Sequence, residues 1–398
     1  MDNTTVRAVN RLTARWAGRT VTGERDSVLT AAGVWPLLAL LADGAGGPAR
    51  EELAGALGIP AGSAAKAARE LLGALAGVRG LQAATGLWAK AGLALEERWL
   101  AELPQGARGE LSGDTEADTK SLDAWASERT GGLIEKMPVE LGEETLLVLA
   151  SALALRLTWA DTFTEWAGPA YDGPWAGKPL RWLHRTTAAL EDVRVTDGAS
   201  GPVTLLRVAG ADEVDVHLVL GPAASPPGEV LAAGIAAVEG AVPAADGTTL
   251  PEGTPGPGLT IRTVDSYSPR PVLRVRTPAF SLLVEHDLLE HAGLFGLESA
   301  SGAEGDHFPG VSRLPLVIGS ARQAAMARFH ATGFEAAAVT AIAAQPRGGM
   351  PRAGHRARHA EAAFTSPFGF LAVHRTSRLV LAAGWVADPD ADPDRVSG

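Results

Sequence analysis

Residues 333–344 read GFEAAAVTAIAA, and QPRGG follows at 345–349. Along one face, at a spacing of two, the side chains are all small or β-branched: Ala336, Ala338, Thr340, Ile342 and Ala344. A strand with such a face fits between two neighbouring strands at little steric cost. The same residues also suit a helix, because alanine is the strongest helix former. Composition alone therefore leaves strand and helix open for this stretch.

The segment that follows, residues 346–359, is rich in Gly, Pro, Arg and His and has no apolar period. Such a composition predicts a solvent-exposed loop. A strand-like stretch that runs directly into an exposed loop indicates a loop that can become a strand.

Composition limits the kind of protein that this chain can be. It has 398 residues, 46% of them hydrophobic and 20% charged, which is enough apolar material for a large core. The formal net charge of −11 argues against general binding to nucleic acids or anionic membranes. The chain has no cysteine, which excludes disulfides, thiol nucleophiles and cysteine-ligated metals.

The beginning of the sequence lacks the basic and apolar regions of a secretory signal. No run of about eighteen apolar residues is present, so no transmembrane helix is expected. The sequence as written is therefore expected to be cytoplasmic.

Hydrophobic spacing predicts helices first and strands later, the pattern of an α+β fold. Helices are expected at 5–17, 34–41, from 48 through 53, 62–76, 96–103, 115–129 and 284–296. Strands are expected at 81–93, 145–159, 214–220 and 273–277, and within 365–386. The segment 145–159 is apolar on both faces for most of its length, which is typical of a central buried strand.

Several spaced motifs resemble the serpin family, in the family's order along nearly the whole chain. They are Gly44–Gly47 with Glu51-Glu52-Leu53; Trp125 with Thr130-Gly131 and Ile134; Leu146 through Trp159 and Phe163; Thr277–Phe280 with Leu288-Leu289 and Leu294–Gly296; Phe308, Gly310 and Ser312; residues 333–340; and Phe364, Pro367-Phe368, Gly384 and Pro389. The hinge-like stretch at 333–340 is the most specific of these.

The resemblance implies a serpin fold: N-terminal helices, a large central mixed β-sheet, further β-sheets and an exposed reactive-centre loop. It implies one serpin domain over residues 1–389, with 390–398 as a disordered acidic tail. It further implies a monomer without cofactor or metal, with a target serine protease as the partner and no nucleic acid or membrane. By analogy with the family, an extracellular location is possible.

The resemblance also implies a mechanism, in which a serine protease attacks the loop as a substrate and forms a covalent acyl complex. The freed hinge then inserts into the main sheet and traps the enzyme. The hinge residues are Gly333, Phe334, Glu335, Ala336, Ala337, Ala338, Val339 and Thr340. The family's usual spacing places the reactive bond at Arg347–Gly348, and arginine suits trypsin-like proteases, which offer a carboxylate.

Other arginines in the long loop remain possible cleavage sites: Arg352, Arg356 and Arg358. Counting backward from Pro367 favours Arg356 as the residue before the cleaved bond. The number of residues between the hinge and the cleaved bond, however, determines how far the protease is carried. We therefore prefer Arg347. The basic cluster from Arg352 to His359 can also be interpreted as a polyanion site or as a merely solubilising segment.

The chain departs from the family at the hinge and at the polar cluster beneath the sheet, called the shutter. Phe334 replaces a small hydroxylated residue, and overpacking costs roughly 1–3 kcal/mol. Either this ring slows insertion, or the sheet has a matching cavity beside a smaller residue such as Ala150 or Ser151. Ala331 replaces the usual glutamate. The shutter and the adjoining top of the sheet correspond to Thr30, Gly33, Ser151, Trp159 and Gln323, without the family's histidine.

Two alternatives to an inhibitor remain, and the first of them follows from Phe334 and the unusual loop. The first is a non-inhibitory serpin that binds or stores another molecule and is cleaved as a plain substrate. The second is a hydrolase, which is disfavoured because no Gly-x-Ser-x-Gly motif is present. His286 and His291 lack the spacing of a zinc helix and are expected on a solvated helix.

Overall fold

The computed structural model describes residues 1–103, 108–137, 139, 141–142, 145–302, 305–334 and 354–390. Helices dominate the first third of this chain and strands the rest, so the α+β prediction is confirmed. The helices are α1 (Asn3–Thr20), α2 (Ala31–Gly44), α3 (Gly47–Leu57), α4 (Ala61–Ala76), α5 (Glu97–Glu102), α6 (Thr115–Thr130), α7 (Pro227–Glu239) and α8 (Ala292–Phe295). None of the helices described has both the length and the apolar character needed to cross a membrane.

Capping residues explain where several helices begin. The Asp114 carboxylate accepts hydrogen bonds from the backbone N–H groups of Glu116 and Ala117 at the start of α6. The Thr30 hydroxyl accepts from the N–H of Gly33 and caps α2 in the same way. These side chains satisfy N–H groups that have no partner within the helix.

The strands form four hydrogen-bonded groups. A seven-stranded sheet has the order β1 (Ser27–Leu29), β18 (Val380–Val386), β17 (Phe368–His374), β9 (Val214–Leu220), β8 (Gly201–Val208), β7 (Val193–Gly198) and β10 (Ala244–Asp246). A six-stranded sheet has the order β11 (Gly253–Gly256), β12 (Leu259–Ser266), β16 (His355–Ala363), β13 (Val272–Pro278), β6 (Pro179–Thr187) and β5 (Thr164–Pro169). The other two groups are β3 (Arg108–Leu111), β2 (Leu81–Lys90) and β4 (Leu147–Leu155), and the pair β14 (Phe280–Asp287) and β15 (Arg322–Phe329).

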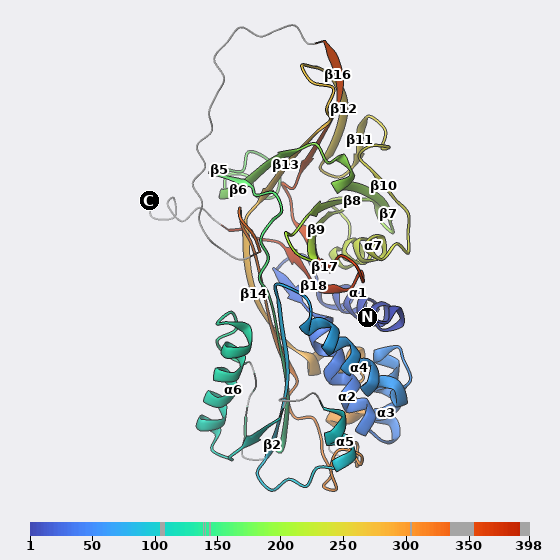
Figure 1. Cartoon of the computed structure of the whole chain (residues 1–398), viewed down its shortest axis with the longest axis vertical. Coiled ribbons are helices and arrows are strands. Elements are labelled where there is room, and N and C mark those ends of the chain that lie inside the picture. Colours follow the sequence, from blue (N-terminus) through green and yellow to red (C-terminus); the bar gives the residue numbers. More distant parts are fainter. Residues whose placement is uncertain are drawn as a thin grey trace.

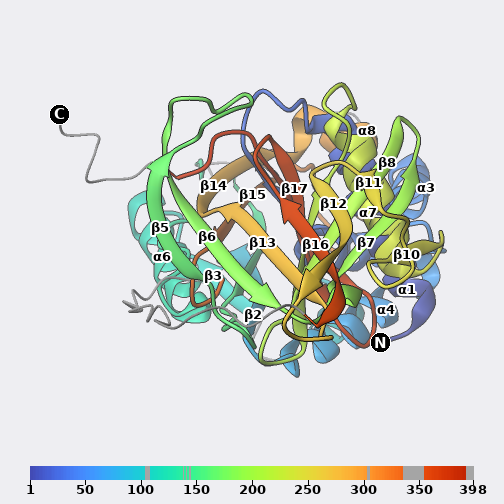
Figure 2. The same ribbon diagram turned by 90° about the horizontal axis from the view of Figure 1, so that it is seen from above.

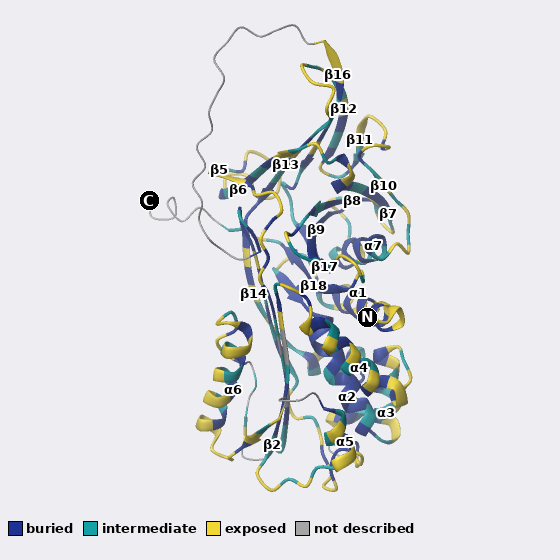
Figure 3. Cartoon of the chain, viewed as in Figure 1, coloured by how far each residue is buried: buried dark blue, intermediate teal, exposed yellow. Residues whose placement is uncertain are grey.

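The main core lies around the seven-stranded sheet. Every residue of β9 and β18 is buried, and α7 and α1 pack beside these strands (Figures 1 and 3). The two helices approach closely at Gly228, where a Cβ atom would come within 2.5 Å of the Gly18 Cα atom. Glycine is therefore needed at this helix contact.

The two smaller groups of strands form the elongated lower part of the molecule (Figure 1). β4 and β15 face each other across the gap between these groups. An isolated antiparallel bridge between Thr158 and Gly333, just above the gap, joins the chain beyond β4 to the chain beyond β15. Within the described ranges no strand lies between β4 and β15. The predicted central strand 145–159 is thus the shorter β4, hydrogen-bonded to β2 on one side and facing a gap on the other.

The segment predicted as an exposed loop at 346–359 is partly a strand. β16 begins at His355 and pairs antiparallel with β12 on one edge and parallel with β13 on the other. The Arg358 guanidinium donates to the backbone oxygens of Gly247, at 2.7 Å, and Leu250. The loop prediction was therefore wrong for Arg356 and Arg358, because pairing with β12 overrides the loop-like composition.

Two further predictions require correction. A helix was expected at 284–296, but β14 continues to Asp287, which pairs with Arg322 of β15, and only Ala292–Phe295 is α-helical. A disordered tail was expected from residue 390, yet the Asp390 N–H donates to Ala279 O at 3.1 Å. Residues 391–398 lie outside the described residues.

The burial of His217 on β9 predicts a pH dependence of stability. Burial, with a contribution from Arg194, lowers the pKa of His217 to about 3 from its ordinary value of 6.5. The unfolded chain therefore takes up this proton near pH 6.5, whereas the folded chain does not. The free energy of unfolding should fall as the pH drops below that value, by about 1.4 kcal/mol per unit from this group.

Urea unfolding at a series of pH values between about 6 and 4 measures this slope. We expect His217→Leu to flatten it and His355→Leu, which replaces an exposed histidine, to leave it unchanged. Equal slopes for His217→Leu and the unaltered chain would contradict the assignment.

Candidate functional site

The hinge begins at the upper end of the gap between β4 and β15. After β15 the chain turns back through residues 330–333, where the His330 N–H donates to Gly333 O at 2.9 Å. The Phe334 N–H then donates to Leu157 O at 2.8 Å, and the Trp159 N–H donates to Thr332 O at 3.1 Å. The first two residues of the predicted hinge are therefore already held against the chain beyond β4.

Gly333 is required by the closeness of this contact. A Cβ atom at this position would lie 2.0 Å from Leu157 O, well inside any possible van der Waals distance. The predicted glycine thus permits the backbone approach on which the pairing depends.

Phe334 occupies the cavity that the sequence required for it. Its side chain is only 2% exposed, and its ring centroid lies 6.2 Å from that of Phe370. The ring lines a residual space of about 10 Å³, the upper cavity, together with Leu153 and Leu155 of β4 and Met326 of β15. The space lies higher than the position beside Ala150 or Ser151 that the sequence suggested.

Trp159 closes the upper end of the gap. It is 4% exposed, its indole N–H donates to His330 O at 2.8 Å, and its ring lies 4.8 Å from that of Phe329. The Phe163 N–H donates to Ala331 O at 2.8 Å. At Ala331, where the family usually has glutamate, this backbone hydrogen bond stabilises the turn at residues 330–333.

The structure brings together the other four predicted shutter residues between α2, β4 and β15. The Gln323 amide donates to Thr30 O at 3.1 Å, and its oxygen accepts from the Thr30 N–H at 3.3 Å. Gly33 completes the cluster, because a Cβ atom there would lie 3.3 Å from Ser151 Oγ and 3.6 Å from Gln323 Nε2. A side chain at this position would crowd these two polar groups.

A larger, mostly apolar space, the lower cavity, lies on the other side of the shutter. Its volume is about 570 Å³. Leu38 of α2, Val148 of β4 and Ala321, just before β15, are among the residues that line it, and Ser151 lies at its edge with the shutter. The gap between β4 and β15 therefore has unfilled space at both ends and a hydrogen-bonded cluster between them.

Comparison with known proteins agrees with this geometry. Residues 7–167 match the family described as Serpin (serine protease inhibitor). A thermophilic serpin, tengpin, in the native state is similar over 98% of this chain and 95% of its own, with a TM-score of 0.75 and 14% identity. Residues 7–167 therefore belong to a serpin domain, and the chain as a whole has the serpin fold.

Two human proteins have the same fold as this serpin. Thyroxine-binding globulin, in complex with its hormone, covers 97% of this chain and 98% of its own, with a TM-score of 0.72 and 16% identity. Glycosylated kallistatin covers 97% of both chains, with a TM-score of 0.70 and 17% identity. A search of curated proteins finds no match.

Part of the predicted site lies outside the residues that the structure describes. These residues are Glu335, Ala336, Ala337, Ala338, Val339 and Thr340 of the hinge, the reactive pair Arg347 and Gly348, and Arg352. The described part of the site in this serpin is therefore the start of the hinge and the gap in front of it.

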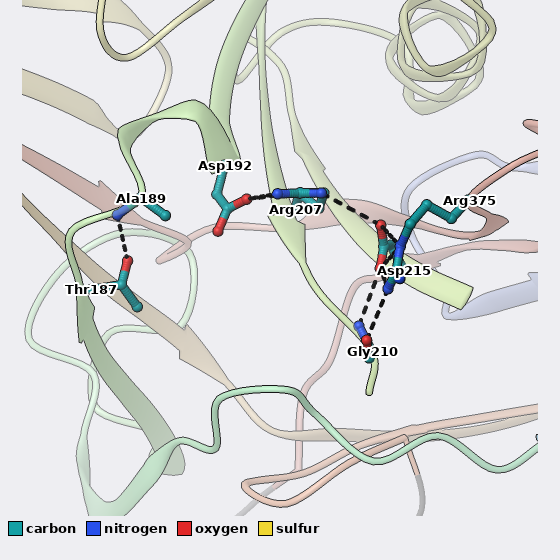
Figure 4. A network of polar contacts seen from close by, with 7 residues as sticks. All are labelled: Thr187, Ala189, Asp192, Arg207, Gly210, Asp215 and Arg375. Carbon is teal, nitrogen blue, oxygen red and sulfur yellow. Dashed lines mark hydrogen bonds and ion pairs between the residues drawn. The ribbon is translucent and has the colours of Figure 1, made fainter. Parts of the chain in front are cut away.

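A charged network supports the upper end of the gap (Figure 4). The chain at Trp159 forms a bridge with Gly210, whose backbone oxygen accepts from Arg375 at 2.8 Å and whose N–H donates to Asp215 at 3.2 Å. Arg375 also donates to the buried Asp215 carboxylate at 2.6 Å, which raises the pKa of Arg375. Arg207 connects Asp215 to a second carboxylate, Asp192. Fixed charges thus hold the loop on which Trp159 rests.

Two histidines near the site were missed or misplaced by the sequence. His286 lies on β14 opposite Gln323, with Nε2 2.7 Å from Val28 O, and not on a solvated helix. His330 Nε2 lies 3.3 Å from Ser281 Oγ, which donates to Asp390 at 3.0 Å. Burial lowers the pKa of both histidines. Helical spacing around His286 was misleading, and no local signal marks His330.

The packing of Phe334 leads to a stability prediction. We expect Phe334→Ala to lower the free energy of unfolding by about 3 kcal/mol, because it removes a buried ring whose cavity the β-strands cannot fully close. Urea unfolding followed by tryptophan fluorescence measures the change.

Tyr171→Ala serves as the aromatic control, since Tyr171 is 75% exposed, and should change stability by less than about 0.5 kcal/mol. If both variants lost the same small amount, the Phe334 ring would not be part of the core.

Proposed function

We propose that this serpin inhibits serine proteases as a suicide substrate, trapping the enzyme by inserting its cleaved loop, residues 333–347, into the main sheet. The observation that carries the proposal is the open gap between β4 and β15, with the first hinge residues already paired at its upper end. A strand entering there would find backbone partners on both edges.

The pairing at the upper end supports one register for such a strand. If the residues continue in step from the bridge between Gly333 and Thr158, Thr340 would lie opposite Ser151 on β4. By the same count from the turn in which His330 binds Gly333, Thr340 would lie opposite Gln323 on β15. The one hydroxyl-bearing residue of the hinge face would thus enter the polar shutter, where its hydroxyl group can be satisfied.

The same register gives the other hinge residues suitable surroundings. Phe334 points into the core, so alternate residues Ala336, Ala338, Ile342 and Ala344 would also point inward. The two alanines nearest Phe334 would pass the narrow part of the gap. Ile342 would come opposite Ala321, which lines the lower cavity, and burying its side chain would contribute about 1.5–3 kcal/mol.

Inhibition requires insertion to be faster than hydrolysis of the acyl-enzyme. The shutter opposes insertion, because its Gln323–Thr30 hydrogen bonds lie in the path of the entering strand. Phe334 does not have to enter after cleavage, since its ring is buried before it. We infer that opening of the shutter, and not entry of Phe334, limits the rate.

We propose Arg347–Gly348 as the reactive bond, with trypsin-like proteases as targets. An arginine at this position can form a bidentate ion pair with a carboxylate in the specificity pocket of the protease. Arg356 and Arg358 are less suitable sites, because this part of β16 would have to separate from β12 before a protease could bind them.

A non-inhibitory serpin, cleaved as a plain substrate, is the second candidate. The observation that favours it is the same buried Phe334 ring. The ring already packs between β4 and β15, so insertion of the remaining hinge would bury less additional apolar surface. One relative of similar fold, thyroxine-binding globulin, is a binding protein by its name. Such a chain would be cut within the loop but would not retain the protease.

Incubation with trypsin distinguishes the two candidates. We expect a complex of serpin and trypsin that survives denaturing electrophoresis, because the acyl bond is covalent. Arg347→Ala should lose attack at this bond. Cleavage after Arg347 with no complex at any ratio of serpin to trypsin would contradict the inhibitor proposal and favour the second candidate.

A matched pair of arginine substitutions tests the register in the same assay. Thr340→Arg would place an unpaired charge between Ser151 and Gln323, at a cost of several kcal/mol, and should convert the serpin into a substrate. Val339→Arg would point to the opposite, solvated face and should still form the complex. Equal complex formation by both variants would show that the proposed register is wrong.

A further inference from the structure

The six-stranded sheet, whose strands are seen from above in Figure 2, carries a row of basic side chains on its outer face. We name as the basic strip Arg262 on β12, His359 on β16, Arg274 and Arg276 on β13, and His184 on β6. The residues that alternate with them, such as Ile261, Ala360 and Val275, are buried, so the strip lies on the face that points away from the core.

Strand register places the residues of the basic strip on one face of the sheet. Arg262 lies opposite His359, Arg274 lies opposite Glu361, and Arg276 lies opposite His184. Directly opposite residues on one face lie about 5 Å apart, within reach of arginine side chains. The guanidinium groups of Arg262 and Arg274 are exposed.

The strip reverses the charge of the chain locally. The formal net charge is −11, whereas on the described part of this face three arginines surround Glu361, which lies 3.8 Å from Arg262, and Asp172 lies at the edge beside Arg276. Burial, and then Arg274 and Arg262, lower the pKa of His359, so the arginines alone carry the charge at neutral pH. An acidic partner would be attracted to this face at long range.

Aromatic side chains border the strip. The Arg276 guanidinium carbon lies 5.4 Å from the centre of the Trp182 ring, and Trp166, paired with Trp182 on the edge strand, is 46% exposed. Arginine and tryptophan are the residues most enriched in the energetically dominant parts of protein interfaces. The composition therefore fits a protein partner better than a linear polyanion, which Glu361 would repel.

The position of the strip relative to the loop indicates that the protein partner is the protease that attacks the loop. β16, the strand that carries His359, begins at His355, directly after the segment that holds Arg347. Arg347 and His355 are separated by eight residue steps, a reach of at most about 28 Å. That is less than the diameter of even a small domain, about 30 Å, so an enzyme holding Arg347 must lie over or beside this sheet.

We propose that the basic strip is a docking surface for an acidic patch beside the active site of the attacking protease, and that it raises the rate at which this protease engages the loop. The inference rests on the proposed attack at Arg347 but not on insertion of the hinge. The basic strip is expected to raise the association rate constant, because complementary charge acts most strongly on that step.

The test uses two trypsins of equal specificity and opposite net charge, one anionic and one cationic. The rate constant for loss of intact serpin is measured, so that complex and cleaved product are counted together. The double variant Arg262→Glu/Arg274→Glu is compared with Lys66→Glu/Arg98→Glu, which makes the same change of charge on α4 and α5 at the other end of the molecule.

At low salt we expect the strip variant to react about 10-fold more slowly with anionic trypsin and no more slowly with cationic trypsin. The control variant should change either rate less than about 2-fold, and about 0.5 M salt should remove the difference. Unchanged rates for the strip variant with both trypsins would overturn the proposal. So would unchanged rates accompanied by a loss of retention on immobilised dextran sulfate, which would assign the strip to a polyanion.

Failure of the proposed inhibition gives a different result. If trypsin cleaves the loop without forming a complex, but the strip variant still slows loss of the intact chain, docking stands and inhibition fails. If complexes form at the same rate for all variants, inhibition stands and docking fails.

Discussion

The structure depends on one backbone contact, in which the Phe334 N–H donates to Leu157 O while Gly333 packs against the same carbonyl. This contact joins the chain after β15 to the chain after β4 above an otherwise open gap. Because it is an antiparallel pairing, it also defines the register of any strand that continues downward. The position of every later hinge residue in the inserted state follows from it.

The rest of the site contains hydrogen bonds that keep the gap open and an apolar cavity that favours filling it. Trp159 and the Arg375–Asp215 network fix the upper end, and the Gln323–Thr30 hydrogen bonds hold the middle. The lower cavity of about 570 Å³ is the opposing element, because its apolar lining has too few packing partners. Under the proposed mechanism, filling this apolar space and pairing the free strand edges would supply the free energy for insertion.

Local hydrophobic spacing in the sequence predicted much of this architecture, so α1, α4 and α6 lie close to their expected ranges. The order of motifs selected Thr30, Gly33, Ser151 and Gln323 as the predicted shutter, and these four residues lie close together in the structure. Contacts between distant segments could not be predicted. Arg356 and Arg358 appear loop-like in composition, but β12, about a hundred residues earlier, pairs with them. His286 and the contact of His330 with Ser281 likewise depend on partners far away in the chain.

The central claim is that the gap between β4 and β15 receives the hinge once the loop has been cut. The most direct test is a crystal structure of the chain after cleavage at Arg347–Gly348. The account expects residues 335–347 as a strand between β4 and β15, with Thr340 between Ser151 and Gln323 and Ile342 in the lower cavity. A cleaved chain in which the gap stays open and Gln323 still bonds Thr30 would contradict it.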